Sequence, residues 1–195
     1  MSPSSRLKER DYSDPGFYFV TICANYKRCV FGSVIRQAVE LTLAGRIPRE
    51  SWAAIPSHFA RVKLHAFVVM PNHFHGILEI AETRLAQHAV PIQGKQRIAG
   101  LDPSSLSVIV RSFKAEVTRR ARLELNWRGE IWQRNYFDRV IRDGRELADV
   151  SRYIAENPMK WEWDRENPQA KITPEGKGLA QHAVPLQRSD RQRNS

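Results

Sequence analysis

The amino-acid sequence predicts an α+β fold of the ferredoxin-like (RRM-like) type, an antiparallel sheet built in the order βαββαβ with one extra helix after the last strand. Four segments rich in β-branched and aromatic residues predict the strands, at residues 17–24, 61–69, 73–80 and 131–142. Helical periodicity appears between the first and second of them and again between the third and fourth. A short turn between the second and third predicts a hairpin.

The first predicted strand, residues 17–24, is almost entirely apolar, which is typical of a strand buried on both faces. It follows a polar N-terminal arm, residues 1–14, that we expect to be flexible. Residues 34–59 then predict helix, because apolar side chains recur there every three to five positions. Gly45 and Pro48 interrupt this stretch, so we expect two helical pieces.

The predicted hairpin joins residues 61–69 to residues 73–80 through a Pro-Asn turn at 71–72, and its second strand opens with His73 and His75. Side chains two apart in a strand share a face and lie about 7 Å apart along it. Two imidazoles on one face can hold a divalent metal ion. Taken alone, however, a His-x-His pair is more simply explained as two structural histidines.

The second half of the chain begins with residues 81–103, which lack periodicity and predict an exposed loop insertion. Residues 104–125 predict a helix with an apolar stripe, and residues 131–142 predict a long strand with interleaved basic and aromatic side chains. The basic side chains on the two elements are Arg111, Lys114, Arg122, Arg134, Arg139 and Arg142. Such a pattern suits contacts to single-stranded nucleic acid, although a solvated helix face and a half-buried strand would also show it.

A capping pattern at Asp143 starts the extra helix, and Pro158 predicts its kink or end near Asn157. Tyr153 and Asn157 stand four residues apart, so they share one helical face. Tyr153 is an acceptable nucleophile, and the Asn157 oxygen suits a hard cation. Lys160 lies near the same face if the helix continues, where it would contact a phosphate. Alone, Tyr153 is more simply an amphipathic side chain at the edge of the core.

The chain carries 31 Lys and Arg against 21 Asp and Glu, a formal net charge of +10, which favours a polyanionic partner. Nucleic acid is preferred over an anionic membrane surface, because the sequence has no basic amphipathic helix and no long apolar segment. The N-terminus lacks the apolar core of a signal peptide, so we expect a cytoplasmic protein that joins the nucleoid when bound to DNA. Cys23 and Cys29 fit no zinc spacing and are expected to be free thiols.

Beyond Asp164 the sequence becomes polar and predicts a basic, disordered tail, residues 165–195, which leaves one domain at residues 15–164. A nine-residue segment at 85–93 recurs almost unchanged at 179–187. Two copies do not make a solenoid, which stacks several repeats. A duplicated DNA segment inserted at two permissive sites explains the recurrence.

Three motifs in this order resemble the REP-associated tyrosine transposases, relatives of the single-tyrosine HUH transposases of insertion-sequence-200-like elements. They are VVMPNHFHG at residues 68–76, IWQRNYFDRVIRD at residues 131–143 and YIAENP at residues 153–158. The resemblance extends over roughly residues 6 to 164. Each motif is of modest specificity alone, and the three in register on compatible elements are a strong signal.

The resemblance implies cutting and rejoining of single-stranded DNA at palindromic repeats that fold into hairpins. His73 and His75 match the paired histidines of the HUH motif, which implies that they hold Mg²⁺ or Mn²⁺. Tyr153 matches the nucleophile that forms a 5′-phosphotyrosine. In the insertion-sequence relatives a glutamine four residues after the tyrosine completes the metal site, and here Asn157, a shorter amide, occupies that position.

Several alternatives stay open at the level of sequence. Tyr136 is a rival nucleophile, although it has no amide four residues further on. A catalytically inactive DNA-hairpin-binding regulator would have the same basic surface. An RNA-binding module shares the βαββαβ order, but it has no use for the histidine pair. Monomer and homodimer are both compatible with the sequence.

Overall fold

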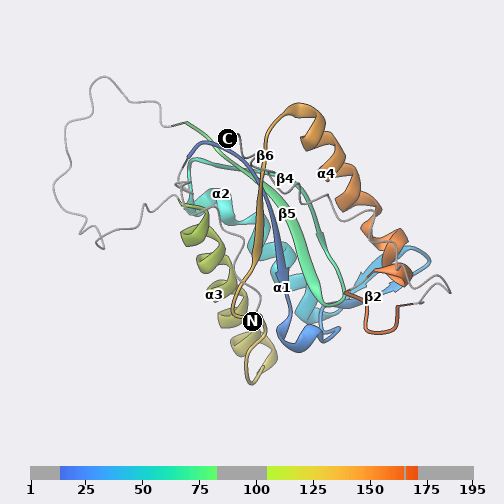
Figure 1. Ribbon diagram of the computed structural model, residues 1–195. Coiled ribbons are helices and arrows are strands. Elements are labelled where there is room, and N and C mark those ends of the chain that lie inside the picture. Colours follow the sequence, from blue (N-terminus) through green and yellow to red (C-terminus); the bar gives the residue numbers. More distant parts are fainter. Residues whose placement is uncertain (1–13, 83–104, 165, 171–195) are drawn as a thin grey trace, which may run out of the picture.

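The computed structural model describes residues 14–82, 105–164 and 166–170, which form a four-stranded antiparallel sheet in the order β4-β5-β1-β6 (Figure 1). The strands are β1 (Gly16–Cys23), β4 (Val62–Val69), β5 (His73–Ile80) and β6 (Phe137–Ile141). β5 lies between β1 and β4, the split arrangement of a ferredoxin-like sheet. The predicted fold class and the β4–β5 hairpin are confirmed.

Helices cover both faces of this sheet. On one side lie α1 (Leu43–Ala53), α2 (Ile55–His58) and α3 (Leu106–Leu125), and on the other lies α4 (Gly144–Glu156) (Figure 1). The larger core, between the sheet and α1 and α3, contains Trp52, Phe74 and Phe113. A smaller core under α4 contains Phe19, Ile77, Val150 and Ile154. No helix in the described ranges is both long and apolar enough to span a membrane.

The first part of the helix predicted over residues 34–59 is wrong. The chain forms a hairpin of β2 (Gly32–Ile35) and β3 (Ala38–Leu41), in which Val34 lies opposite Val39. Its two-residue turn places Arg36 and Gln37 at φ 50° and 65°, the left-handed geometry that matches the twist of paired strands. This turn lacks the glycine or asparagine that usually marks such a hairpin, so the local sequence does not signal it.

Two helical pieces do follow the hairpin, but the break between them is not at Gly45 or Pro48. The Thr42 side chain caps α1 by accepting a hydrogen bond from the Gly45 N–H at 3.1 Å, so the helix starts only at Leu43. The break falls at Ala54, where α1 ends and α2 begins.

The long strand predicted over residues 131–142 is also wrong in its first half, because only Phe137–Ile141 joins the sheet as a strand. The Lys114 ammonium on α3 binds the carbonyl groups of Gln133 and Arg134, at 2.6 and 3.0 Å, and so takes two acceptors that a strand ladder would use. Trp132 still forms an isolated bridge with Ala24.

The extra helix agrees with its prediction. The Asp143 carboxylate accepts a hydrogen bond from the Glu146 N–H at 2.8 Å and caps α4. At Pro158 the α-helix has already given way to a 3₁₀ helix, η2 (Asn157–Trp163). Most of the loop insertion and both copies of the duplicated segment lie outside the described residues.

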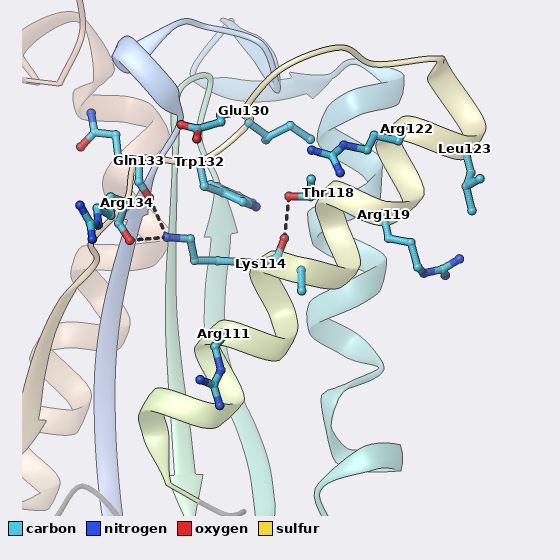
Figure 2. A pocket seen from close by; sticks show the side chains of 12 residues that line it. Arg111, Lys114, Thr118, Arg119, Arg122, Leu123, Glu130, Trp132, Gln133 and Arg134 are labelled. Carbon is cyan, nitrogen blue, oxygen red and sulfur yellow. Dashed lines mark hydrogen bonds between the residues drawn. The ribbon is translucent and has the colours of Figure 1, made fainter. Parts of the chain in front are cut away.

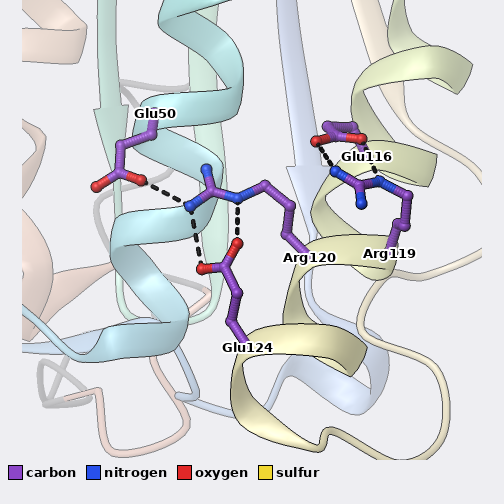
Figure 3. A network of polar contacts seen from close by, with 5 residues as sticks. All are labelled: Glu50, Glu116, Arg119, Arg120 and Glu124. Atoms are coloured by element: carbon purple, nitrogen blue, oxygen red, sulfur yellow. Dashed lines mark hydrogen bonds and ion pairs between the residues drawn. The ribbon is translucent and has the colours of Figure 1, made fainter.

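Ion pairs on the surface connect α1 and α3 (Figure 3). The Arg120 guanidinium contacts Glu50 of α1 at 2.9 Å and Glu124 of its own helix at 2.6 Å. Arg119 forms a second pair with Glu116 at 2.7 Å. Exposed pairs of this kind contribute little to stability, but they neutralise two of the arginines of α3 locally.

Gly76 gives the first testable prediction, because a Cβ atom there would lie 2.6 Å from Cζ2 of Trp52 and 2.8 Å from Cε1 of Phe74. We expect Gly76→Ala to lower the free energy of unfolding by about 1–3 kcal/mol through overpacking, measured by urea denaturation. Gly144→Ala is the control, since a Cβ at Gly144 meets no atom within 4 Å. Equal stability of the two variants would contradict the packing argument.

Candidate functional site

Two buried histidines lie side by side on the face of the sheet that α4 covers. His73 and His75 both belong to β5, with exposed fractions of 0% and 5%, and their ring centroids are 4.5 Å apart. Phe74, between them, points to the opposite face and packs against Trp52 at 4.7 Å. The common face predicted from strand alternation is therefore confirmed.

A hydrogen bond to the neighbouring residue, Asn72, fixes the His73 ring. The Asn72 amide nitrogen donates to the carbonyl groups of Lys27, at 3.1 Å, and Glu166, so the amide oxygen is the atom that faces Nδ1 of His73, at 2.8 Å. Because that oxygen only accepts, Nδ1 of His73 carries the proton. Nε2 is then an unprotonated acceptor, and it is buried without a hydrogen-bond partner in the described structure.

His75 is held in a similar way from the adjacent strand. Thr21 lies opposite it in the β1–β5 ladder, and the Thr21 hydroxyl is 2.8 Å from Nδ1 of His75. Both rings are thus oriented through Nδ1, which leaves Nε2 of each to other partners. Histidines that bind metals are usually held in this way, with the second ring nitrogen hydrogen-bonded to the protein.

Burial keeps both imidazoles neutral. Desolvation, with a smaller contribution from the Lys27 ammonium, lowers the pKa of His73 to about 3. Desolvation and the neighbouring His73 lower the pKa of His75 well below its usual value. Both rings therefore have an available lone pair at neutral pH, the state that a metal ion requires.

The helix α4 places the Tyr153 phenol beside the histidine pair, and Asn157 follows at the C-terminal end of this helix. The Tyr153 ring meets His75 edge-on, with 5.5 Å between centroids, and Phe19 at 6.2 Å. Asn157, one turn further along, is 2% exposed. Its Oδ1 is buried and accepts no hydrogen bond from the residues that the structure describes. Tyr153 of the predicted helical face thus lies against His75, and the Asn157 side chain is hydrogen-bonded to the Tyr153 phenol.

The environment of Tyr153 favours the protonated phenol, because it raises the pKa of this side chain. Desolvation by burial raises the pKa of its phenol to about 12, and the carboxylates of Asp164 and Glu166 act in the same direction. A hydrogen bond from the Asn157 side chain opposes them and lowers the pKa. The phenol therefore needs activation before it can act as a nucleophile.

The atoms available to coordinate a metal at this site fit a divalent cation. Two of them, Nε2 of His73 and Oδ1 of Asn157, are buried and accept no hydrogen bond in the described residues. Such unsatisfied atoms cost stability unless something binds them. Over residues 14–82, 105–164 and 166–170, no group of three His, Cys, Asp or Glu side chains is placed to hold a metal ion. The third donor here is an amide oxygen, which such a grouping does not include.

Two charged residues near the histidines were missed in the sequence. Lys27 lies close enough to His73 to affect its pKa, and its ammonium is 2.9 Å from the Glu166 carboxylate. Glu166 falls in the segment that the sequence assigns to the tail, yet its backbone carbonyl accepts a hydrogen bond from Asn72. Neither residue stands in a pattern that would have identified it.

Four of the predicted DNA-binding side chains, Arg111, Lys114, Arg122 and Arg134, line one groove of about 870 Å³ (Figure 2). The groove lies between α3 and residues 130–134, so it is on the other side of the sheet from Tyr153. Burial lowers the pKa of the Lys114 ammonium, which is occupied by the two backbone carbonyls described above. Lys114 thus shapes the wall of the groove.

The other predicted DNA-binding residues lie elsewhere. Arg139 of β6 forms an ion pair with Glu146, and the Arg142 backbone N–H donates to the same carboxylate at 2.8 Å. Lys160 pairs with Glu156 at 2.7 Å. The groove therefore unites four of the seven predicted residues, and these three are outside it.

The rival nucleophile, Tyr136, lies on the opposite face of the sheet. It packs at the edge of the core beneath α3, and its hydroxyl is 3.3 Å from the Ser107 hydroxyl. Tyr153 packs with the core beneath α4, the side of the histidine pair. Of the two tyrosines, Tyr153 is the one on the face of the histidine pair, and it contacts His75.

The lowered pKa values of the two histidines predict a loss of stability in mild acid. Both rings bind a proton near pH 6.5 in the unfolded chain, whereas the folded protein resists protonation down to about pH 3 at His73. The unfolded state therefore binds more protons between these limits, and stability falls as the pH falls below 6.5. With a chelator present, we expect a loss of about 2–3 kcal/mol in unfolding free energy from pH 7 to pH 5.5, by urea denaturation.

The double variant His73→Gln/His75→Gln is the comparison, because it removes both titrating groups. We expect its stability to depend less steeply on pH over the same interval. Parallel curves for the variant and the unaltered chain would assign the acid sensitivity to other groups.

The chain has a relative by sequence and a solved structure of similar fold among known proteins. No protein-family model matches the sequence. An uncharacterized protein of Haemophilus influenzae is 40% identical over 164 residues, which cover 83% of this chain and 91% of the relative. The solved structure of a REP-associated tyrosine transposase bound to a REP hairpin has a TM-score of 0.55 at 20% identity, covering 85% of this chain and 77% of that one. The chain therefore belongs to the family of the Haemophilus influenzae protein and shares its fold with that transposase.

Proposed function

We propose that this protein is a tyrosine transposase that cuts and rejoins single-stranded DNA at palindromic repeats folded into hairpins. The observation that carries the proposal is the packing of the Tyr153 ring against His75, with Asn157 one turn further along the helix. A nucleophile of the right chemistry thus contacts two of the three candidate cation ligands, His75 and Asn157. The solved transposase with the same fold is bound to a REP hairpin, which supports this class of substrate.

His73, His75 and Asn157 would hold Mg²⁺ or Mn²⁺. A bound divalent cation supplies Lewis-acid stabilisation for the negative charge that builds on a phosphate oxygen during transfer. The protein would contribute the orientation of both imidazoles, through Asn72 and Thr21. It would also contribute the buried amide oxygen of Asn157, which has no competing partner in the described residues.

In the cleavage step, Oη of Tyr153 would attack the phosphorus of the scissile phosphodiester while the bond to the 3′ oxygen breaks. The phenolic proton is lost during the attack, and the departing 3′ oxygen takes up a proton. The products are a 5′-phosphotyrosine and a free 3′-OH. Attack by a second 3′-OH reverses the step and restores the phenol, so strands are rejoined without ATP.

The raised pKa of Tyr153, about 12, means that its activation is a substantial part of catalysis. The Asn157 side chain already favours the ionised phenol through a hydrogen bond. Positive charge next to the phenol would favour it further. Asn157 would thus have two roles, since its nitrogen lowers the pKa of Tyr153 while its oxygen would bind the cation.

The groove beside α3 would bind the DNA backbone. Arg111, Arg122 and Arg134 contribute cationic groups to it, and Trp132 lines it. Arginines bind phosphate oxygens in a bidentate manner, and each neutralised phosphate releases counterions, so binding should weaken as salt rises. The net charge of +10 agrees with this.

Tyr153→Phe tests the nucleophile directly. Incubated with Mn²⁺ and a single-stranded repeat hairpin with flanking bases, the unaltered protein should form a covalent DNA adduct on denaturing gels. The variant lacks the attacking oxygen, so the adduct should be lost while hairpin binding stays within about twofold. Tyr136→Phe is the matched control and should retain the adduct. Loss of the adduct in Tyr136→Phe only would reverse the assignment, and binding without any adduct would favour an inactive hairpin-binding regulator.

Asn157→Ala tests the metal site without DNA. Because the substitution also removes the hydrogen bond between the Asn157 side chain and Tyr153, the Mn²⁺ response of each protein is measured against its own metal-free melting temperature. The stabilisation produced by Mn²⁺ in thermal unfolding should shrink, corresponding to at least tenfold weaker binding. An unchanged Mn²⁺ response would remove Asn157 from the ligand set.

A further inference from the structure

A strained turn next to the histidine pair carries an unusually exposed aromatic ring. The turn, η1 (Asn25–Lys27), follows β1, and Tyr26 in it is 84% exposed. This is the highest exposure among the large apolar and aromatic side chains of the described residues. An aromatic side chain this accessible contributes little to folding, so the fold itself does not explain its presence.

The backbone of this turn is held in a conformation that its residues rarely adopt. Tyr26 and Lys27 have φ values of 54° and 52°, two successive left-handed residues that are not glycine. Such geometry persists only where the surroundings impose it, and it is common at functional sites. Here the Lys27 N–H donates to the Ala24 carbonyl at 3.0 Å, and the Asn72 side chain donates to the Lys27 carbonyl at 3.1 Å.

The turn is anchored on both candidate functional surfaces. On one side Asn72, which orients His73, binds it. On the other side the Asn25 N–H donates to the Ile131 carbonyl at 2.6 Å, and Ala24 bridges Trp132. Ile131 and Trp132 line the groove of Figure 2. A nucleic-acid strand that extends from the groove to the histidines would therefore pass this turn.

The residues of the turn have the chemistry of a platform for single-stranded nucleic acid. Unpaired bases stack on exposed aromatic rings, and nearby cations bind the phosphates between them. Lys27, which pairs with Glu166, and the exposed Arg28 follow Tyr26 directly. Bases inside a duplex have their faces covered by stacking, so an isolated ring of this kind selects unpaired ones.

We propose that Tyr26 stacks on an unpaired DNA base next to the hairpin, and so positions the single strand between the groove and the histidine pair. The inference rests on the proposed function, since it assumes a single-stranded DNA substrate. It deepens that function by assigning the recognition of flanking bases to a residue outside the three motifs of the sequence.

Tyr26→Asn tests the proposal with the backbone preserved, because asparagine tolerates the left-handed conformation better than tyrosine and lacks the ring. The probes are a DNA hairpin with single-stranded flanks and the same hairpin without them, with binding followed by fluorescence anisotropy. We expect roughly 5- to 150-fold weaker binding of the flanked hairpin and an unchanged affinity for the blunt one. Tyr26→Phe and Tyr26→Trp should bind both probes like the unaltered protein.

Leu43→Ala is a matched control, since Leu43 is another exposed apolar side chain, at 63%. It should leave both affinities unchanged. Normal binding of the flanked hairpin by Tyr26→Asn, or equal losses for both probes, would overturn the stacking role. If the unaltered protein forms the Tyr153 adduct while Tyr26→Asn binds normally, this inference alone is wrong. If Tyr26→Asn loses the flanked hairpin but no adduct ever forms, the proposed chemistry is wrong and the platform stands.

Discussion

The buried side chain of Asn72 connects the parts of this molecule on which the candidate site depends. Its oxygen accepts from His73, and its nitrogen donates to the backbone carbonyls of Lys27 and Glu166. These residues come from β5, the turn after β1 and the segment after η2. One amide, 0% exposed, therefore sets the tautomer of a candidate ligand and holds two distant segments against it. Neither aspartate nor leucine offers the same combination of donor and acceptor.

The site is built at a cost that the surrounding core has to offset. Two neutral imidazoles are buried, and Nε2 of His73 and Oδ1 of Asn157 lack hydrogen-bond partners in the described residues. Unsatisfied buried groups destabilise a fold. Here Phe74 of the same strand packs against Trp52 on the other face, where the larger core supplies the offsetting burial. Natural proteins break the rules of polar satisfaction mainly where function requires it.

Much of this arrangement was visible in the sequence, because it rests on local periodicity. Alternation in β5 placed His73 and His75 on one face, and the four-residue spacing placed Tyr153 with Asn157. The errors came from tertiary contacts. The turn at Arg36 has no glycine, so its hairpin looked helical, and Lys114 withdraws two carbonyls from the predicted last strand. The contact of Glu166 with Asn72 spans 94 residues, and no local pattern encodes such a pair.

The sheet separates the groove, which would bind DNA, from the Tyr153 phenol, which would carry out the chemistry. The groove lies on the α3 side of the sheet and Tyr153 on the α4 side. The end of β1 is tied to the groove, because the Asn25 N–H donates to the Ile131 carbonyl and the Gln133 N–H donates to the Cys23 carbonyl. On α3, Arg119 and Arg120 are paired with carboxylates, so Arg111 and Arg122 remain the principal cationic groups of the groove wall. A polyanion held there would be positioned without touching the nucleophile. Changes in the groove should therefore act on binding, whereas changes at the histidines and the phenol should act on the covalent step, because the sheet keeps the two sets of side chains on opposite faces.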